Sequence, residues 1–189
     1  SFKPSKYLDH NYLNISQYLL EKFDEEYIAF LTDDYKKIYM RSIYNNTDKK
    51  HYIYRLSDEN SINLYSIKHK ELDHNTPTVV IAEGIFDILV FYYSDFYRKV
   101  LDMEPNYFIS IFGKSNYSHC ISKICRKLKA PRINCCILSD SDVLITEYNK
   151  LKNKFPYIKK MRVLYNKLSK DFGNIKELNE NEVIVYHFE

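Results

Sequence analysis

The sequence lacks several features that would assign it to a familiar class of protein. No apolar run is long enough to span a bilayer, so no membrane partner is expected, and the first residues lack the pattern of a signal peptide. The four cysteines include no Cys-x-x-Cys pair, so we expect reduced, buried thiols rather than a zinc ribbon. A net charge of +3 is too small to indicate a nucleic-acid partner by itself.

The charged residues are nevertheless unevenly distributed along the 189 residues. Six Lys or Arg and no acid lie between Glu104 and Asp140, and eight more, again without an acid, lie between Glu147 and Asp171. These runs bracket acidic residues, as in a groove that binds a polyanion around metal-binding carboxylates. Solvated helix faces are the alternative interpretation of either run.

The first part of the chain predicts a short helix followed by an antiparallel meander. Residues 17–23 have a helical apolar pattern. Aromatic and β-branched stretches separated by Asp and Asn turns then predict four strands, at residues 27–31, 38–44, 51–56 and 62–67. The composition turns polar at residues 72–77. We therefore expect a small β-rich α+β domain in residues 1–75 and a second domain in residues 76–189.

The second part alternates strand and helix patterns. Apolar runs predict buried strands at residues 78–82, 107–112, 133–139 and 161–165. Helical patterns separate them, at residues 85–97, from Ser118 onward and at residues 144–155. This alternation predicts an α/β fold with a parallel sheet and right-handed crossovers. The last stretch, residues 183–188, predicts an edge strand or the first strand of a further domain.

Polar residues follow three of these strands directly. They are Glu83, Lys114 within the turn Gly113-Lys114-Ser115, and Asp140 and Asp142. Asp87 lies one helical turn after Glu83, so both carboxylates can face the same opening. Because ligands bind outside the carboxyl ends of parallel strands, we expect these residues to meet at one site. Asp87 and Asp142 could instead serve as helix caps or first-turn residues.

The ordered motifs Glu83-Gly84-x-x-Asp87-x-Leu89, Gly113-x-Ser115 and Asp140-x-Asp142 resemble the Toprim domain of primases, topoisomerases and some nucleases. The Gly-x-Ser turn is most similar to that of bacterial and phage DNA primases. The resemblance covers residues 79–176, and it implies a Toprim parallel-sheet domain preceded by a small β-rich domain. Lys170-Asp171 resembles the late acidic element of these domains, although Asn174 stands where a second acid often occurs.

Nucleotidyl transfer requires a deprotonated hydroxyl and a neutralised triphosphate, and clustered carboxylates provide for both by binding Mg²⁺ or Mn²⁺. We expect Asp140 and Asp142 as the main metal ligands, with Asp171 contributing. Glu83 is the expected general base or a further ligand. Asp87 is expected to orient Glu83 or a metal-bound water, and the turn of Gly113, Lys114 and Ser115 is expected to hold a phosphate.

The first domain carries a second, looser similarity to phage-type primases. It consists of Lys37-x-x-x-Arg41 followed by His51-Tyr52-x-Tyr54-Arg55. In this interpretation Lys37, Arg41 and Arg55 contact template or nucleotide phosphates, and Tyr52 or Tyr54 stacks on bases. An ordinary exposed strand face is the alternative.

The resemblance implies a DNA primase, a DNA-directed RNA polymerase that makes short primers from NTPs on single-stranded DNA. A replicative helicase and a zinc-binding module outside this chain would then be its partners, in the cytoplasm of a bacterium or of a phage-infected host cell. A Toprim nuclease or RNA-maturation enzyme and a non-catalytic nucleic-acid-binding module remain alternatives. A topoisomerase is less expected, because 189 residues leave no room for the large domain that presents a nucleophilic tyrosine.

Overall fold

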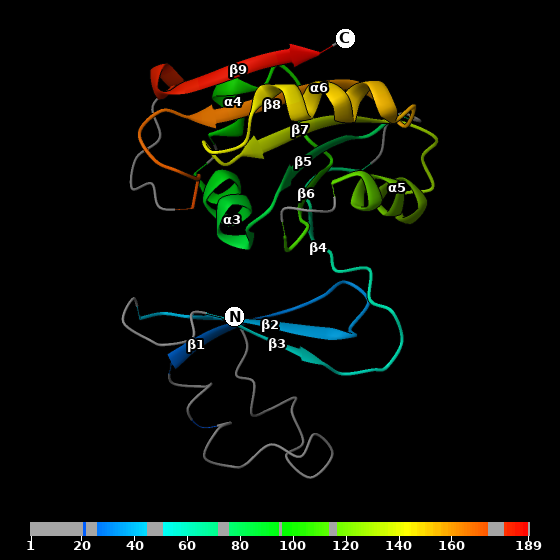
Figure 1. Ribbon diagram of the computed structural model, residues 1–189, viewed down its shortest axis with the longest axis vertical. Helices are drawn as coiled ribbons and strands as arrows, with labels where there is room; N and C mark the ends of the chain where they lie inside the picture. Colours follow the sequence, from blue (N-terminus) through cyan, green and yellow to red (C-terminus); the bar gives the residue numbers. More distant parts are fainter. Residues whose placement is uncertain are drawn as a thin grey trace. The chain divides into compact units, whose positions relative to one another are not determined.

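The chain folds into two compact units, residues 1–65 and 66–189 (Figure 1). The computed structural model describes residues 21, 26–44, 51–71, 76–94, 96–113, 117–173 and 180–188. The helix predicted at residues 17–23 lies outside the described residues except for Glu21. The division falls earlier than the polar stretch at residues 72–77, because strand β4 (Tyr65–Lys68) belongs to the sheet of the second unit.

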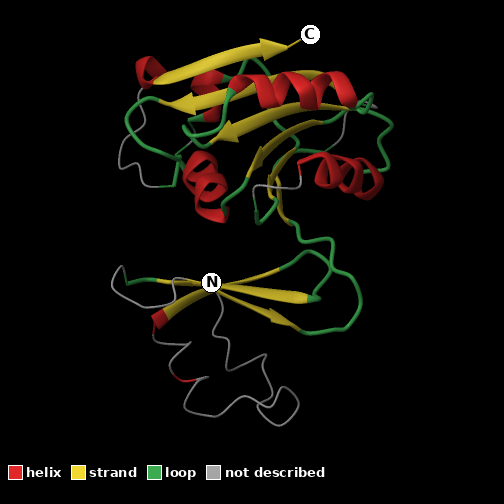
Figure 2. Ribbon diagram, in the orientation of Figure 1, coloured by secondary structure: helices red, strands yellow, loops and turns green. Residues whose placement is uncertain are grey.

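The first unit contains an antiparallel sheet of three strands (Figure 2). The strands are β1 (Tyr27–Leu31), β2 (Lys37–Ser42) and β3 (His51–Arg55). Alternate residues point to one face, where a buried cluster of Tyr27, Ala29, Ile38 and Met40 forms the core of this unit. Three strands of the predicted meander are confirmed. The fourth prediction, that residues 62–67 extend the same sheet, is wrong, because β4 pairs beside β6 of the other sheet.

The second unit is built on a mixed, mostly parallel sheet in the order β4-β6-β5-β7-β8-β9. Strands β6, β5, β7 and β8 are parallel, as predicted, and β9 is antiparallel to β8 at the edge. The bounds are β5 (Thr78–Ala82), β6 (Tyr107–Ser110), β7 (Ile133–Ser139), β8 (Ile158–Asn166) and β9 (Val183–Phe188).

Helices cover both faces of this sheet, so its central strands are buried on both sides. The helices are α3 (Ile85–Tyr93), α4 (Tyr97–Val100), α5 (Tyr117–Lys127), α6 (Ile145–Lys154) and the 3₁₀ turn η3 (Glu180–Glu182). The single helix predicted at residues 85–97 is divided in two. Ser94 ends α3, and its hydroxyl donates to the Phe91 carbonyl (3.3 Å), a bond that competes with helix continuation.

One buried cluster lies between α3, α4 and one face of the sheet. Its members include Val80, Phe91, Phe108, Cys136 and Phe172, each 2% exposed or less. The alternate strand residues point to the other face, where α5 contributes buried apolar side chains.

All four cysteines are free and buried, as predicted. Burial raises the pKa of Cys120 to about 11 and that of Cys136 to about 12, so these thiols stay protonated at neutral pH. Within the described ranges, the helices are too short or too polar to cross a bilayer.

Candidate functional site

Two predicted site residues meet where neighbouring parallel strands end. Glu83 directly follows β5, and Asp140 directly follows β7. These strands pair with Ala82 beside Leu138, so their carboxyl ends lie at the same edge of the sheet. Glu83 and Asp140 line one cavity of about 370 Å³. This volume lies within the range of sites that hold small molecules, roughly 300–1,000 Å³.

Two tyrosines form part of the wall of this cavity. Tyr148 of α6 donates its hydroxyl hydrogen to Ser139 Oγ (2.8 Å), and Ser139 donates in turn to the Asp140 carbonyl (2.9 Å). Tyr117 of α5 packs edge-on against Tyr148 with 5.8 Å between ring centroids. Burial raises the pKa of Tyr148 to about 12 and that of Tyr117 well above its ordinary value. Both hydroxyls therefore stay protonated, so they can donate hydrogen bonds but are poor nucleophiles.

The loop that follows β8, residues 167–173, is held against the Asp140–Asp142 turn. The Ser141 N–H donates to the Lys170 carbonyl (2.8 Å). The Lys170 ammonium lies 3.2 Å from Asp142 Oδ2 and 3.9 Å from Asp140 Oδ2. We did not predict a role for Lys170, although its position beside Asp171 at a strand end was a usable signal.

Asp87 connects the start of α3 to the same loop. Its Oδ1 accepts the Phe172 N–H (3.0 Å), and the side chain is 8% exposed. Glycines make this contact possible, since a Cβ on Gly84 would lie 2.4 Å from Asp87 Oδ2 and one on Gly173 3.1 Å from Oδ1. The sequence predicted that Asp87 orients Glu83 or a metal-bound water. The structure shows that Asp87 binds the backbone of the loop after β8, and its role toward Glu83 or a metal-bound water stays a prediction.

The pKa of Asp87 is raised from 3.8 to about 7. Desolvation by burial is the largest cause, and the negative charges of Asp171 and Asp140 add to it, whereas hydrogen bonds from the backbone of Gly173 and Phe172 oppose it. The negative charges of Asp171 and Asp140 therefore reach the start of α3, although burial of Asp87 is the larger effect.

The four residues predicted as metal ligands do not form a complete ligand set. Among the described residues, no group of three or more His, Cys, Asp or Glu is arranged to hold a metal ion. Asp142 is half-exposed beside Lys170, and Asp171 Oδ1 accepts the Gly173 N–H (3.1 Å). Glu83 and Asp140, which share the cavity, still match the usual magnesium arrangement of one or two carboxylates completed by water and substrate phosphates.

The predicted phosphate-binding turn lies mostly outside the described residues, since Lys114 and Ser115 are not among them. Gly113 is described, and its φ of +141° is a conformation that residues with a Cβ rarely adopt. A glycine is therefore required at the start of this turn. Its contact with phosphate stays a prediction, and Asn174 likewise lies outside the described residues.

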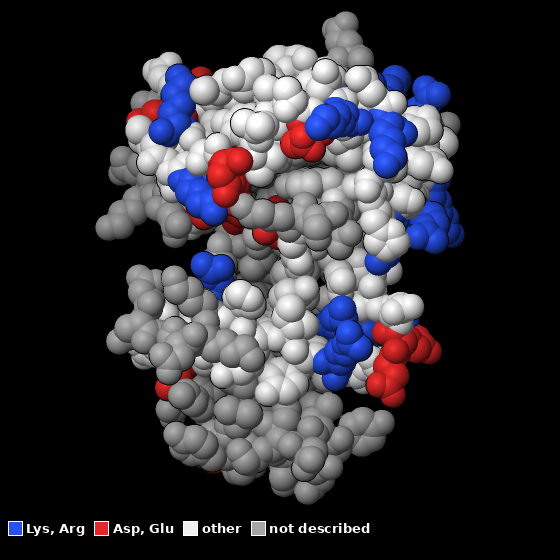
Figure 3. All heavy atoms as spheres, viewed as in Figure 1, with Lys and Arg blue, Asp and Glu red and all other residues white. Residues whose placement is uncertain are grey.

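The basic runs that bracket the acids in the sequence do not surround them in the described structure. Most of these side chains lie where α5 and α6 end and where β7 and β8 begin, which is the opposite edge of the sheet (Figure 3). The exceptions include Lys167 and Lys170 in the loop after β8. Among the described residues, these two runs therefore do not form the expected basic groove around the carboxylates.

The basic residues of the first unit share one face of its sheet. Lys37 is paired with Arg55 across β2 and β3, and Arg41 follows on the same face of β2. Tyr52 is paired with Met40 and points to the other face, beside the core of the unit. Tyr52 therefore does not share a surface with the three basic residues, because adjacent residues of a strand point in opposite directions.

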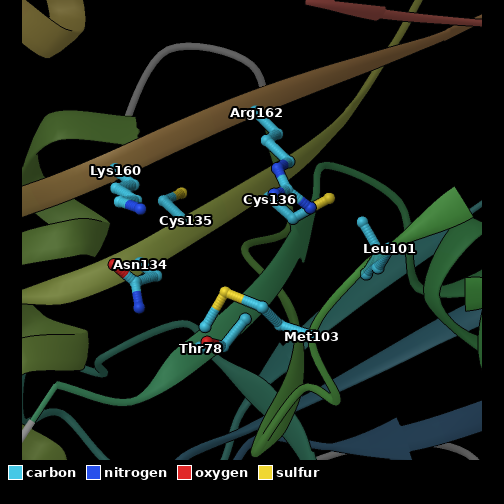
Figure 4. A pocket seen from close by; sticks show the side chains of 8 residues that line it. All are labelled: Thr78, Leu101, Met103, Asn134, Cys135, Cys136, Lys160 and Arg162. Atoms are coloured by element: carbon cyan, nitrogen blue, oxygen red, sulfur yellow. The ribbon is translucent and has the colours of Figure 1, made fainter. Parts of the chain in front are cut away.

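A second cavity lies on the α4 face of the sheet, near the beginnings of β5, β7 and β8 (Figure 4). Thr78, Asn134 and Lys160 line it, and Asn134 Oδ1 is a buried acceptor without a hydrogen-bond partner among the described residues. The cavity measures about 30 Å³, which suits water rather than a nucleotide. The larger cavity beside Glu83 and Asp140 is therefore the candidate functional site.

Comparisons of the chain with protein-family models, with curated proteins and with solved structures found no match.

Proposed function

We propose that this chain is the catalytic core of a DNA primase of the bacterial and phage type, with a Toprim domain in residues 76–189. The observation that carries the proposal is the pair of carboxylates, Glu83 and Asp140, at the ends of adjacent parallel strands in one cavity of nucleotide size. Lys170 and Asp142 lie beside this pair. The ordered motifs Glu83-Gly84-x-x-Asp87 and Asp140-x-Asp142 support it from the sequence.

The reaction would join the α-phosphate of an NTP to the 3′-hydroxyl of a primer and release pyrophosphate. Glu83 would accept the hydroxyl proton, and Asp140 and Asp142 are the residues that would hold Mg²⁺ or Mn²⁺. The ion would neutralise the triphosphate and stabilise the leaving pyrophosphate. The Lys170 ammonium contacts Asp142, and in this proposal it would contact a phosphate oxygen instead when substrate binds. Tyr117 lines the cavity, and its hydroxyl is hydrogen-bonded to Tyr148, so it would shape the cavity wall rather than donate to substrate.

A non-catalytic nucleic-acid-binding module is the second candidate. The observation that favours it is the absence, among the described residues, of a group of three metal-ligating side chains. Lys170 also neutralises part of the negative charge of Asp140 and Asp142 without a metal ion. In this function the cavity would bind a nucleotide or a strand end and leave it unchanged.

Primer extension tests the proposal. The template is single-stranded DNA with an annealed RNA oligonucleotide, so that extension does not depend on a helicase or a zinc module for initiation. Glu83→Gln and Asp140→Asn remove the proposed base and metal ligand, and Glu104→Gln, a partly exposed acid paired with Lys70, is the matched control. We expect NTP-dependent extension with Mg²⁺ or Mn²⁺ by the parent and by the control, and none by the two site variants.

Other outcomes separate the alternatives. Shortened DNA that depends on Glu83 and Asp140 would indicate a metal-dependent nuclease, which uses the same site to direct water at a phosphodiester. Binding of the primed template without any change in either strand would support the non-catalytic module. Extension that survives both site substitutions would place the chemistry elsewhere in the chain.

A further inference from the structure

Basic side chains gather at the end of the second unit that is opposite to the candidate site. Helix α5 ends at Lys127 and α6 ends at Lys154, and each helix is followed by the start of the next strand. We call this surface the basic end, and its members are Arg126, Lys127, Lys129, Arg132, Lys152, Lys154, Lys159 and Lys160. All except Lys152 are exposed. Figure 3 shows Lys and Arg side chains on this side of the unit.

The pairing of β7 with β8 brings the two halves of the basic end together. Ile133 lies beside Ile158, and the Ile133 N–H donates to the Tyr157 carbonyl (2.8 Å). Arg132, which precedes β7, is thus adjacent to the segment that leads into Lys159. The register shifts between Ile133 and Asn134, which leaves Lys159 without a paired residue on β7, and both Lys159 and Lys160 are exposed at the start of β8.

No acidic residue belongs to the segments that form the basic end. The sequence contains no Asp or Glu at residues 105–139 or 148–170, which include the whole basic end. In the loop that leads into β6, Asp102 forms an ion pair with Arg162, and Glu104 forms one with Lys70 (3.2 Å). Among the residues that the structure describes, the charged side chains of the basic end are therefore all positive, and such a surface attracts polyanions.

Tyr157 gives this surface a second property. It lies between Lys154 and Lys159, and its side chain is 43% exposed. An aromatic ring among cationic side chains is the combination that binds single-stranded nucleic acid, because the cations neutralise phosphates and the ring stacks on a base. A lipid surface would gain little from a single tyrosine, since membrane binding also needs a broad apolar face.

We propose that the basic end binds the backbone of single-stranded nucleic acid, with Tyr157 stacking on a base. The surface is separate from the candidate active site, because β7 has seven residues and so spans about 20 Å at roughly 3.3 Å per residue. The proposal does not depend on the proposed activity. Backbone binding at this end would equally serve a polymerase, a nuclease or a non-catalytic module.

Anisotropy of a fluorescent single-stranded oligonucleotide of mixed sequence tests this proposal in the full chain. The variant is Lys129→Gln/Arg132→Gln/Lys159→Gln, and the matched control is Lys68→Gln/Lys70→Gln/Lys99→Gln, which removes the same charge elsewhere in the second unit. We expect the variant to bind about tenfold or more weakly than the control. The slope of log K against log salt should become shallower by about 2, because each lost contact with a single-stranded phosphate contributes about 0.7.

Tyr157→Ala supplies a readout that charge alone would not change. We expect it to weaken binding while leaving the salt slope unchanged, because stacking releases no counterions. Equal affinities and equal slopes for the basic-end variant and its control would overturn the proposal. So would loss of binding to vesicles of anionic lipid with retained binding to the oligonucleotide.

Two further measurements keep these outcomes interpretable. The thermal midpoint of each variant is compared with that of the parent, and single substitutions of Arg132 and Lys159 replace the triple variant if it is destabilised. Primer extension by the basic-end variant is measured at saturating template. If the variant binds the oligonucleotide more weakly but still extends primers, the basic end is a binding surface separate from the active site. If the parent extends no primers and the variant still binds more weakly, the binding proposal holds although the proposed function fails.

Discussion

The buried carboxyl group of Asp87 makes the stability of the second unit depend on pH. The pKa is 3.8 for an ordinary Asp and about 7 in the folded chain, so the folded state binds the proton more tightly than the unfolded state. The free energy of unfolding therefore falls as the pH rises from about 4 to about 7 and is constant above that range with respect to this group. Asp87→Asn removes the titration and keeps an oxygen that can accept the Phe172 N–H.

The magnitude follows from the size of the pKa shift. A difference of about 3 units corresponds to about 4 kcal/mol, at roughly 1.4 kcal/mol per unit. Relative to the parent, Asp87→Asn should therefore gain little stability near about pH 4 and up to about 4 kcal/mol near about pH 8. Between about pH 5 and about pH 8 the difference between the two proteins should grow by about 2.5 kcal/mol.

Urea unfolding of parent and variant across this pH range measures the difference. The control is Asp102→Asn, because the ion pair with Arg162 lowers the pKa of that carboxyl group. A lowered pKa acts only below about pH 4, so the difference between this control and the parent should stay constant between about pH 5 and about pH 8. A difference between parent and Asp87→Asn that stays the same from acid to neutral pH would show that Asp87 does not titrate in this window.

Three substitutions test the contacts around the loop at residues 167–173. Gly84→Ala should lower the free energy of unfolding by about 1–3 kcal/mol, because the new Cβ would lie 2.4 Å from Asp87 Oδ2; an unchanged urea midpoint would contradict this. Phe172→Ala should cost about 3–5 kcal/mol, since the ring is 1% exposed and packs against Phe91, and a loss below about 1 kcal/mol would refute its burial. Tyr148→Phe should cost about 1 kcal/mol through the lost bond to Ser139, with Tyr157→Phe as a control that should be neutral.

The sequence predicted the second unit well because its strands are buried on both faces. Residues 78–82 and 133–139 are continuous apolar runs, a pattern that parallel strands between two helical layers require. Such runs end sharply at polar residues, so the positions of Glu83 and Asp140 at strand ends could be inferred from the sequence. Their common cavity then follows from the pairing of β5 with β7.

The parts that could not be predicted depend on contacts between distant residues. A short stretch such as β4 has the same pattern whichever sheet it joins, because pairing partners are chosen by tertiary contacts. The contact between Asp87 and the Phe172 backbone joins residues that are far apart in the sequence. The role of Lys170 likewise depends on how the loop after β8 folds back onto the Asp140–Asp142 turn.

The charged residues show the same limit of prediction from sequence. A run of basic residues beside an acid in sequence suggests proximity, but a helix that follows a parallel strand carries the chain back to the other edge of the sheet. The residues after α5 and α6 are therefore separated from the acids by the full length of a strand. The sequence therefore indicates which residues are acidic and which are basic, but not that the candidate site and the basic end lie far apart.

The four buried thiols provide a reporter of how often the second unit opens. They lie on α5 and β7, on both faces of the sheet, and their raised pKa values leave almost no thiolate in the folded state. An alkylating reagent should therefore label this chain only during opening events, so the labelling rate measures the free energy of opening without any added probe. Bound nucleotide or template should slow that rate if it stabilises the unit, which makes ligand binding measurable before any reaction is known.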